Sequence, residues 1–537
     1  MISTLLNIWR LVRASLVLAH HGIRFIPKGV KVPLILHIAH VLTWPLQVLF
    51  ISFRVSHSRE TKVSRALSKL GPSYVKLGQF IATRADLIDH ELANDLRNLQ
   101  DRQPPFSMRE AISAVEDSLG GKLKDHFLYF GPPIAAASIA QVHKAVVVQD
   151  GIERNVAVKI LRPGIEHHIQ RDIDSYFFAA HMIERFYPLS RRLKPVAIVN
   201  NLKKTTEFEM DLRLEGAAIS EMTDNINSNP SFDTKSFRVP KVDWKRTSKR
   251  ILTLEWIEGT PISQIEKLRE DGHDLRALGH AVLSSFLHHV MHDGFFHADM
   301  HQGNLLVEPN GTIVAVDFGI IGHLSKIERR FLAEILHGLI TRDYALAAQV
   351  HFDAGYVPAN HPVALFAQAM RAIGEPIHGR TANEISMAKL LGQLFAYTDV
   401  FDMETRPELI LLQKSMVIVE GVARSLDPKI NIWTAAQPVA ENWMQQNYGI
   451  YGRMRETSES AGEIGKIISK APRILEHIDR SVYAFTKMAK NGIYLDDYTI
   501  NRMVKESSKY QKNERWPLRL ISISITIALW LILAEQI

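Results

Sequence analysis

FFHADMHQGNLL, residues 295–306, contains His297, Asp299, His301 and Asn304 within eight positions. On a strand, where alternate residues face the same way, the first three could bind a metal ion. The same residues also fit a phosphoryl-transfer loop, H-x-D followed five positions later by Asn. In such a loop the aspartate orients or deprotonates the acceptor, and the asparagine binds magnesium. The segment by itself allows both interpretations.

Two further motifs favour the phosphoryl-transfer interpretation. The segment AVDFGI at 315–320 places Asp317 eighteen residues after Asp299, at the end of an apolar strand-like run. The aspartate of such a D-F-G motif is the second magnesium ligand of protein kinases. Upstream, NVAVKIL at 155–161 places Lys159 on a valine-rich strand, in the V-A-x-K pattern that binds the α/β-phosphates. The metal-cage interpretation leaves Asp317 and Lys159 unexplained, so we predict ATP and Mg²⁺ as cofactors.

A lysine that binds phosphates needs an acidic partner, and TEFEMDLRLEGAA at 206–218 supplies candidates. On one continuous helix Glu207, Asp211 and Glu215 would share a face and repel one another unless cations lay opposite. Lys159 and a metal ion are the cations we expect there. Glu209 would lie around the helix from this face and pair with Arg213. A solvated helix face is the alternative.

The loop expected over the phosphates lacks glycine. It reads PPIAAASIAQV at 132–142, with alanines where backbone amides should approach a nucleotide. Each Cβ restricts positive φ and keeps the backbone away from the phosphates, which would handicap an ordinary kinase.

This alanine loop, together with KLGQ at 76–79, resembles the UbiB family of atypical protein-kinase-like proteins, which is linked to ubiquinone biosynthesis. The resemblance runs from about residue 60 to the C-terminal anchor. It implies that Asp299 is the catalytic aspartate, that Asn304 and Asp317 hold the metal, and that Lys159 binds phosphates while paired with Glu215. The segment that would cover the nucleotide consists of Ile134, Ala135, Ala136, Ala137, Ser138, Ile139, Ala140, Gln141 and Val142.

The resemblance also assigns a signature to residues that the motifs above leave unexplained. Lys76 and Gln79 would lie on a helix across the place where a peptide substrate docks, and Glu209 and Asp211 would form an E-x-D motif in which Glu209 pairs with Lys76. The sequence departs from the family pattern at Gln302, where proline is usual, and the loss of proline's fixed φ predicts a looser loop. It also has room for one C-terminal hydrophobic pass where bacterial relatives usually have two.

The implied function is ATP binding and hydrolysis in support of ubiquinone biosynthesis, more than phosphorylation of proteins. The implied partners are other ubiquinone-biosynthesis proteins or quinone precursors, and the implied location is the bacterial inner membrane, with the catalytic domain on the cytoplasmic side. A kinase acting on a small molecule or a pathway protein is one alternative. A nucleotide-gated scaffold or lipid-presenting protein is another.

The composition agrees with a globular protein that has an anionic partner. The 537 residues are 46% hydrophobic and include no cysteine, which excludes disulfides, thiolate zinc sites and cysteine nucleophiles. The net charge is +7, without an arginine-rich tract interleaved with aromatics, so we predict binding to anionic membrane lipid and not to nucleic acid.

Two apolar segments could meet the membrane. Residues 516–537 contain no charge from Leu520 to Ala534 and can just cross a bilayer if Arg519 snorkels. A basic cluster precedes them, as the positive-inside rule expects on the cytoplasmic side: Lys505, Lys509, Lys512 and Arg515. A buried terminal helix is the alternative. Residues 32–53 include a proline and several polar groups, which favours an interfacial or packed helix over a crossing.

The expected fold class is α+β, an atypical protein-kinase-like two-lobed fold with an N-terminal helical extension and a C-terminal transmembrane anchor. A β-hairpin is expected at 142–161, strands near 250–259, 304–307 and 312–319, and helices at 61–85, 165–222 and in most of the chain after 275. The predicted divisions are amphipathic helices at 1–60, a helical extension at 61–125, an N-lobe at 126–258, a helical C-lobe at 259–500, a basic linker at 501–515 and the anchor at 516–537.

Overall fold

The computed structural model describes residues 2–20, 62–82, 104–186, 194–229, 232–378 and 406–430, with short pieces at 96, 397, 400–403, 438–439 and 443. The chain divides into two units, Met1–Met444 and Gln445–Ile537, and every described residue lies in the first. The predicted segments at 32–53, 501–515 and 516–537 lie outside the described residues. None of the helices in the described ranges is long and apolar enough to cross a membrane.

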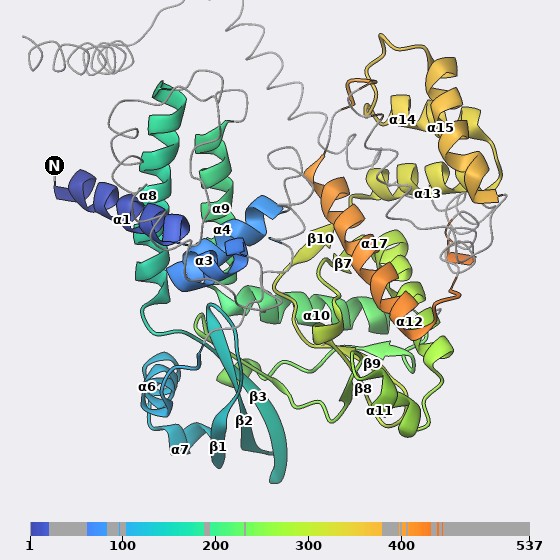
Figure 1. Cartoon of the computed structure of the whole chain (residues 1–537). Helices are drawn as coiled ribbons and strands as arrows, with labels where there is room; N and C mark the ends of the chain where they lie inside the picture. The colour runs from blue at the N-terminus through green and yellow to red at the C-terminus, as the bar shows by residue number, and fades with distance from the viewer. Residues whose placement is uncertain are drawn as a thin grey trace, which may run out of the picture. The chain divides into compact units, whose positions relative to one another are not determined.

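The described chain is α+β, as predicted, with three small sheets and many helices (Figure 1). The strands are β1 (Tyr129–Ala136), β2 (Ala140–Gln149), β3 (Ile152–Leu161), β4 (Phe237–Arg238), β5 (Ile251–Glu255), β6 (Thr260–Pro261), β7 (Phe295–His297), β8 (Leu305–Val307), β9 (Ile313–Ala315) and β10 (Ile321–His323). They form sheets in the orders β1-β2-β3-β5, β4-β9-β8-β6 and β10-β7.

The helices of this part are α1 (Ile2–His20), α3 (Lys62–Leu70), α4 (Pro72–Ala82), α6 (Met108–Leu119), α7 (Leu123–His126), α8 (Ile165–Phe186), α9 (Pro195–Glu209), α10 (Leu212–Ser228), α11 (Ile265–Glu270), α12 (Leu275–His288), α13 (Lys326–Ile340), α14 (Tyr344–Asp353), α15 (Val363–His378) and α17 (Pro407–Leu426). Short 3₁₀ turns lie at Trp244–Arg246 and Gln302–Asn304, and a π-helical turn at His289–Asp293 follows α12.

The predicted hairpin is β2–β3, with Val142 opposite Lys159. Its turn is Asp150-Gly151, where both residues have positive φ (54° and 76°), the conformation of a tight turn that matches the twist of the strands. Strand β1 was not separately predicted. It contains Pro132 and Pro133, which cannot donate to a ladder, and its pairing with β2 shifts register around them. Since β1 is an edge strand, the sheet tolerates these prolines.

The prediction of one acidic helical face at 207–215 was wrong. The chain leaves the helix between α9 and α10, and Asp211 is the N-cap of α10, where its side chain accepts a hydrogen bond from the Arg213 N–H. An N-cap aspartate has non-helical backbone angles, so the i, i+4, i+8 spacing does not place the three carboxylates together. Glu207 pairs with Lys203 within α9.

The helical stretch predicted at 61–85 is divided into two helices, α3 and α4. Gly71, with φ of 115°, separates α3 from α4, and Pro72 opens α4 at a position where its missing N–H costs nothing. Ser107 caps α6 in a capping box with Glu110. Helix α6 packs its buried alanine and valine side chains against the sheet of β2, β3 and β5.

The largest hydrophobic core packs against the strands that carry the candidate functional residues. It is built around α12, whose Val282, Leu283 and Phe286 are buried beside β7–β9 and α17. Helices α12 and α17 run side by side (Figure 1), and a Cβ on Gly279 would already press on the Ala423 carbonyl of α17. A separate cluster joins α14 and α15.

Candidate nucleotide and metal site

Lys159 on β3 lies between two carboxylates that come from distant parts of the chain. Its Nζ donates to both carboxylate oxygens of Glu215, at 2.8 and 2.9 Å, and lies 3.4 Å from Oδ2 of Asp317. Glu215 lies in the first turn of α10, where an acidic side chain is favoured, and is buried. Asp317 follows β9 and is half exposed. The pairing of Lys159 with Glu215 that the resemblance implied is present.

The charges at this triad shift its pKa values. Desolvation lowers the pKa of Lys159, but the charges of Asp317 and Glu215 outweigh it, so the net shift is upward. Desolvation raises the pKa of Glu215 above its ordinary value, although Lys159 opposes the shift. Desolvation also raises the pKa of Asp317, but Lys159 and the Gly319 N–H outweigh it and bring the value down to about 2. Lys159 and Asp317 are therefore charged at neutral pH.

The loop after β7 fixes the backbone around Asp299. The His297 ring accepts the Asp299 N–H at Nδ1, 3.0 Å, and lies against the Phe318 ring with 4.7 Å between centroids. Asn304 donates from Nδ2 to the Asp299 carbonyl oxygen at 3.1 Å. The side chain of Asp299 is about one-third exposed, so its carboxylate can reach a substrate.

Two backbone links hold this loop and the D-F-G segment together. Strand β10 pairs with β7, with Ile321 opposite His297, and the Ala298 N–H donates to the Ile320 carbonyl. The Val316 N–H donates to the Asn304 carbonyl at 3.0 Å. A side chain at Gly322 would overlap the buried Phe296 ring, so any larger residue there requires that ring to move.

The residues assigned to metal binding fit magnesium. Asn304 uses its amide nitrogen for the loop, which leaves Oδ1 for a cation, and Asp317 offers an ionised carboxylate beside it in the fold. Amide and carboxylate oxygens are the hard ligands that Mg²⁺ prefers, and it usually keeps several waters and phosphate oxygens as well.

Most of the predicted alanine loop is strand, because residues 132–136 belong to β1 and residues 140–142 to β2, and only Ala137, Ser138 and Ile139 connect the two strands. None of Ile134–Val142 has positive φ, so these alanines carry no backbone strain. The loop is held by Arg162, whose side chain donates to the Ala137 carbonyl at 3.2 Å. Of the nine residues, Ile134 and Ala135 are exposed, Ala136, Ala137 and Val142 are half-buried, and Ser138, Ile139, Ala140 and Gln141 are buried. Gln141 accepts the Phe106 N–H instead of facing a ligand. Only the loop's backbone and its exposed side chains can touch a nucleotide.

The signature residues meet across two helices. Lys76 of α4 lies 3.0 Å from Oε2 of Glu209, the last residue of α9, as the resemblance implied. Gln79 is half-buried one turn further along α4. Asp211 pairs with Arg213, at 2.6 Å, so the expected pairing of Arg213 with Glu209 was wrong.

The sequence motifs do not point to α17, yet three of its residues contact the loop around Asp299. They are Lys414, Ser415 and Ser425, and their contacts with Asp299, Ala298 and Gln302 measure 3.8, 3.0 and 2.9 Å. Gln302, where the family pattern expects proline, thus donates a hydrogen bond that proline has no group to make.

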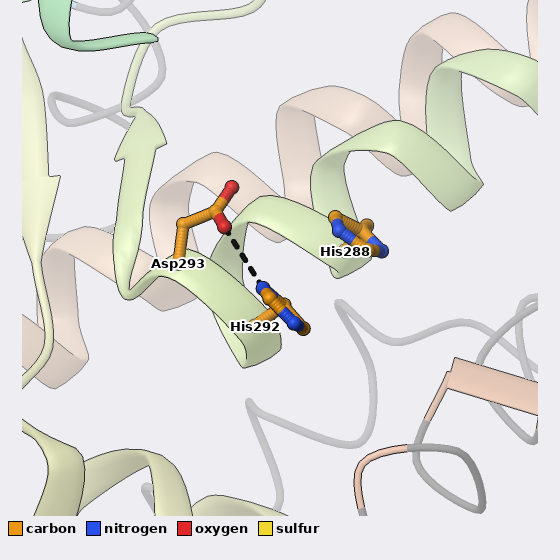
Figure 2. Close-up of side chains that lie close together, drawn as sticks. All are labelled: His288, His292 and Asp293. Atoms are coloured by element: carbon orange, nitrogen blue, oxygen red, sulfur yellow. Dashed lines mark hydrogen bonds and ion pairs between the residues drawn. The ribbon is translucent and has the colours of Figure 1, made fainter. Parts of the chain in front are cut away.

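The metal-cage interpretation of His297, Asp299 and His301 gains no support. Nδ1 of His297 and of His301 accept backbone N–H groups of the loop, and His301 Nε2 lies 3.9 Å from Asp299. Within the described part of the chain, a different group has the spacing of a metal site: His288, His292 and Asp293 at the π-helical turn (Figure 2).

This second group is a hydrogen-bonded structural cluster. Asp293 accepts from His289 at 2.8 Å and from His292 at 3.1 Å. The rings of His288 and His292 are stacked, 14° from parallel and 5.0 Å apart (Figure 2), so their in-plane lone pairs do not converge on one point. Burial lowers the pKa of His288 to about 4, which fits a neutral packed ring.

Two domain families match the chain. An ABC1 atypical kinase-like domain matches residues 98–351, and a UbiB helical domain matches residues 370–431. The chain is 37% identical over 425 residues to the probable protein kinase UbiB of Marinobacter nauticus, covering 77% of this chain and 76% of that protein. It is 36% identical over 428 residues to the probable protein kinase UbiB of Pseudomonas aeruginosa, covering 79% of each.

Among solved structures, the Rv3197–erythromycin complex from Mycobacterium tuberculosis aligns at 22% identity with a TM-score of 0.43, over 73% of this chain and 98% of that one. The sequence relatives and the two domain matches settle the classification. This classification agrees with the arrangement of Lys159, Glu215, Asp299, Asn304 and Asp317 in the site. The chain belongs to the UbiB family of ABC1 atypical kinase-like proteins.

Proposed function

We propose that this protein binds Mg-ATP and transfers its γ-phosphoryl group to water or to an unidentified acceptor, in support of ubiquinone biosynthesis at a membrane. The carrying observation is the Lys159–Glu215–Asp317 triad, because it places a fixed cation and a metal-binding carboxylate 3.4 Å apart. The link to ubiquinone rests on the UbiB relatives.

Each residue has a defined task in this proposal. Glu215 holds Lys159 so that its ammonium can face the α/β-phosphates without rotamer freedom. Asn304 and Asp317 hold Mg²⁺, which neutralises charge on the phosphate oxygens. Asp299, held by the loop and partly exposed, orients the attacking hydroxyl or water and accepts its proton.

The membrane part of the proposal is supported by α1, which packs on the protein with one side and exposes apolar residues on another. One side packs on the protein: Ala14 is buried, Asn7 accepts from Ser175, and Arg10 donates to the Arg171 carbonyl. The other side carries exposed large apolar residues: Leu6, Ile8, Trp9, Val12 and Leu16. A helix held in this way and with such an exposed apolar face, in a chain of net charge +7, suits the surface of an anionic bilayer.

Phosphate release from Mg-ATP by the purified full chain, with and without anionic vesicles, tests the proposal. We expect release that anionic vesicles stimulate, and that Asp317→Ala lowers by about a hundredfold or more, the scale on which such a charge contributes. Asp224→Ala removes an exposed carboxylate from α10 and is the matched control, expected to behave as wild type.

Two results would contradict the proposal. Magnesium-dependent release by Asp317→Ala at the wild-type rate would remove the metal assignment. Tight nucleotide binding by the wild-type protein without release, and without transfer of label to any component of a membrane extract, would favour a nucleotide-gated scaffold instead.

A further inference from the structure

The carboxylate of Asp299 has a neighbour from outside the kinase-like domain. Lys414 of α17 places Nζ 3.8 Å from Asp299 Oδ1, and both side chains are about one-third exposed. Helix α17 belongs to the region that matches the UbiB helical domain, whereas Asp299 belongs to the kinase-like match. The acid at the reaction centre and its neighbouring cation are therefore contributed by two different domains.

Helix α17 holds the loop on both sides of Asp299. The Ser415 hydroxyl, fully buried, lies 3.0 Å from the Ala298 carbonyl oxygen and 2.7 Å from that of Leu411. Nε2 of Gln302 donates to Ser425 Oγ at 2.9 Å. Ser415 and Ser425 are ten residues apart, about 15 Å along a helix. The loop thus runs along α17, and Lys414 is placed by a rigid element and not by a flexible segment.

The distance suits a positioning role. At 3.8 Å the Lys414 ammonium still attracts the Asp299 carboxylate, and the partial exposure of both side chains screens that attraction. The ammonium does so without the short hydrogen bond that would occupy the oxygen needed by the substrate. His301 Nε2 lies 3.9 Å from Oδ2, the other carboxylate oxygen of Asp299.

We propose that Lys414 is a positioning residue for Asp299, so that the helical domain completes the reaction centre of the kinase-like domain. This inference rests on the proposed phosphoryl transfer. Lys414 attracts one oxygen of the Asp299 carboxylate and thereby restricts the rotation of that side chain. Removing Lys414 lowers the rate of the chemical step while leaving nucleotide binding at Lys159 intact.

The test compares three variants in steady-state hydrolysis of Mg-ATP by the full chain. Lys414→Met lowers kcat by about tenfold or more, the scale of a misplaced catalytic group, with KM for Mg-ATP nearly unchanged. Lys414→Arg restores most of kcat because it returns the charge. Lys267→Met, an exposed lysine of α11, leaves both constants unchanged. Wild-type kcat in Lys414→Met, or failure of arginine to rescue it, overturns the inference.

A second measurement does not depend on turnover. Hydrogen exchange of peptides that cover residues 296–304 reports how firmly the loop is held. We expect faster exchange there in Lys414→Met and in Ser425→Ala, and unchanged exchange in the β2–β3 hairpin. If the wild-type protein neither releases phosphate nor transfers label to a component of a membrane extract, the proposed function fails while this experiment still decides the inference. Exchange equal to wild type in both variants overturns it.

Discussion

Substitution of Glu215 should lower both the free energy of unfolding and the affinity for Mg-ATP. It is buried and accepts two hydrogen bonds from Lys159, so Glu215→Ala leaves a partly buried ammonium with Asp317 as its remaining partner. We expect urea denaturation to show a loss of about 3 kcal/mol, the lower end for removing one member of a buried pair. Glu207→Ala, which breaks an exposed pair within α9, should cost under about 0.5 kcal/mol.

A double substitution at the Lys159–Glu215 pair distinguishes the effect of an unpaired charge from the effect of lost packing. Lys159→Met with Glu215→Leu removes both charges, so most of the lost stability should return while affinity for Mg-ATP disappears. If the double variant is no more stable than Glu215→Ala, the ion pair is not the source of the loss.

Helix α1 is the element for which membrane contact can be tested directly. The double substitution Trp9→Glu and Val12→Glu places two charges on its exposed apolar side, where both side chains are solvent-accessible, so folding should be preserved. Each large apolar side chain contributes about 1.5–3 kcal/mol when buried. We therefore expect at least about tenfold weaker flotation of the full chain with phosphatidylglycerol vesicles.

Ile327→Glu, at an equally exposed site on α13, provides the matched control and should float as wild type does. Equal flotation of the double variant would show that α1 does not contact the bilayer.

Elements with strong local signals were predicted from the sequence, and those decided by tertiary context were not. The β2–β3 hairpin follows from alternation and from Asp150-Gly151. Strand β1 was not predicted because its two prolines are tolerated only in an edge strand, and the local sequence does not show which strand lies at the edge of the sheet. The end of α9 was missed because helical periodicity continues past residue 210, whereas the N-cap of Asp211 stops it.

The site shows the same division. Lys159, Asp299, Asn304 and Asp317 lie in motifs with fixed spacing, and the structure brings them to one region. The contact of Lys414 with Asp299 joins residues more than a hundred positions apart without any motif, so it follows only from the packing of α17 on α12.

For the whole molecule, acid should reduce stability in a defined pH window. Burial lowers the pKa of His351 from 6.5 to about 4, and that of His297 likewise to about 4. Between pH 6.5 and 4 the unfolded chain binds protons that the folded chain does not, so lowering the pH favours unfolding. Each histidine contributes a slope of up to about 1.4 kcal/mol per pH unit in this window, and none above or below it.

Urea denaturation from pH 7.5 to 4.5 measures this slope. His351→Gln removes a ring that packs against Phe366 of α15, and it should reduce the slope by the contribution of about one proton, even though the stability of the variant at pH 7.5 is lower. A slope unchanged by this substitution would show that His351 is not the group that titrates.

The two-stranded β7–β10 ladder has a consequence for how the family can vary. A side chain at Gly322 would overlap Phe296, and one at Gly294 would overlap the Leu324 carbonyl and the Arg329 side chain. Neither glycine carries a chemical group, yet both adjoin the backbone that sets the distance between Asp299 and Asp317. In a survey of all single substitutions, these two positions should tolerate as little as the acidic residues themselves. Evolutionary constraint at this site therefore applies also to two glycines, because the packing around them leaves no room for a side chain.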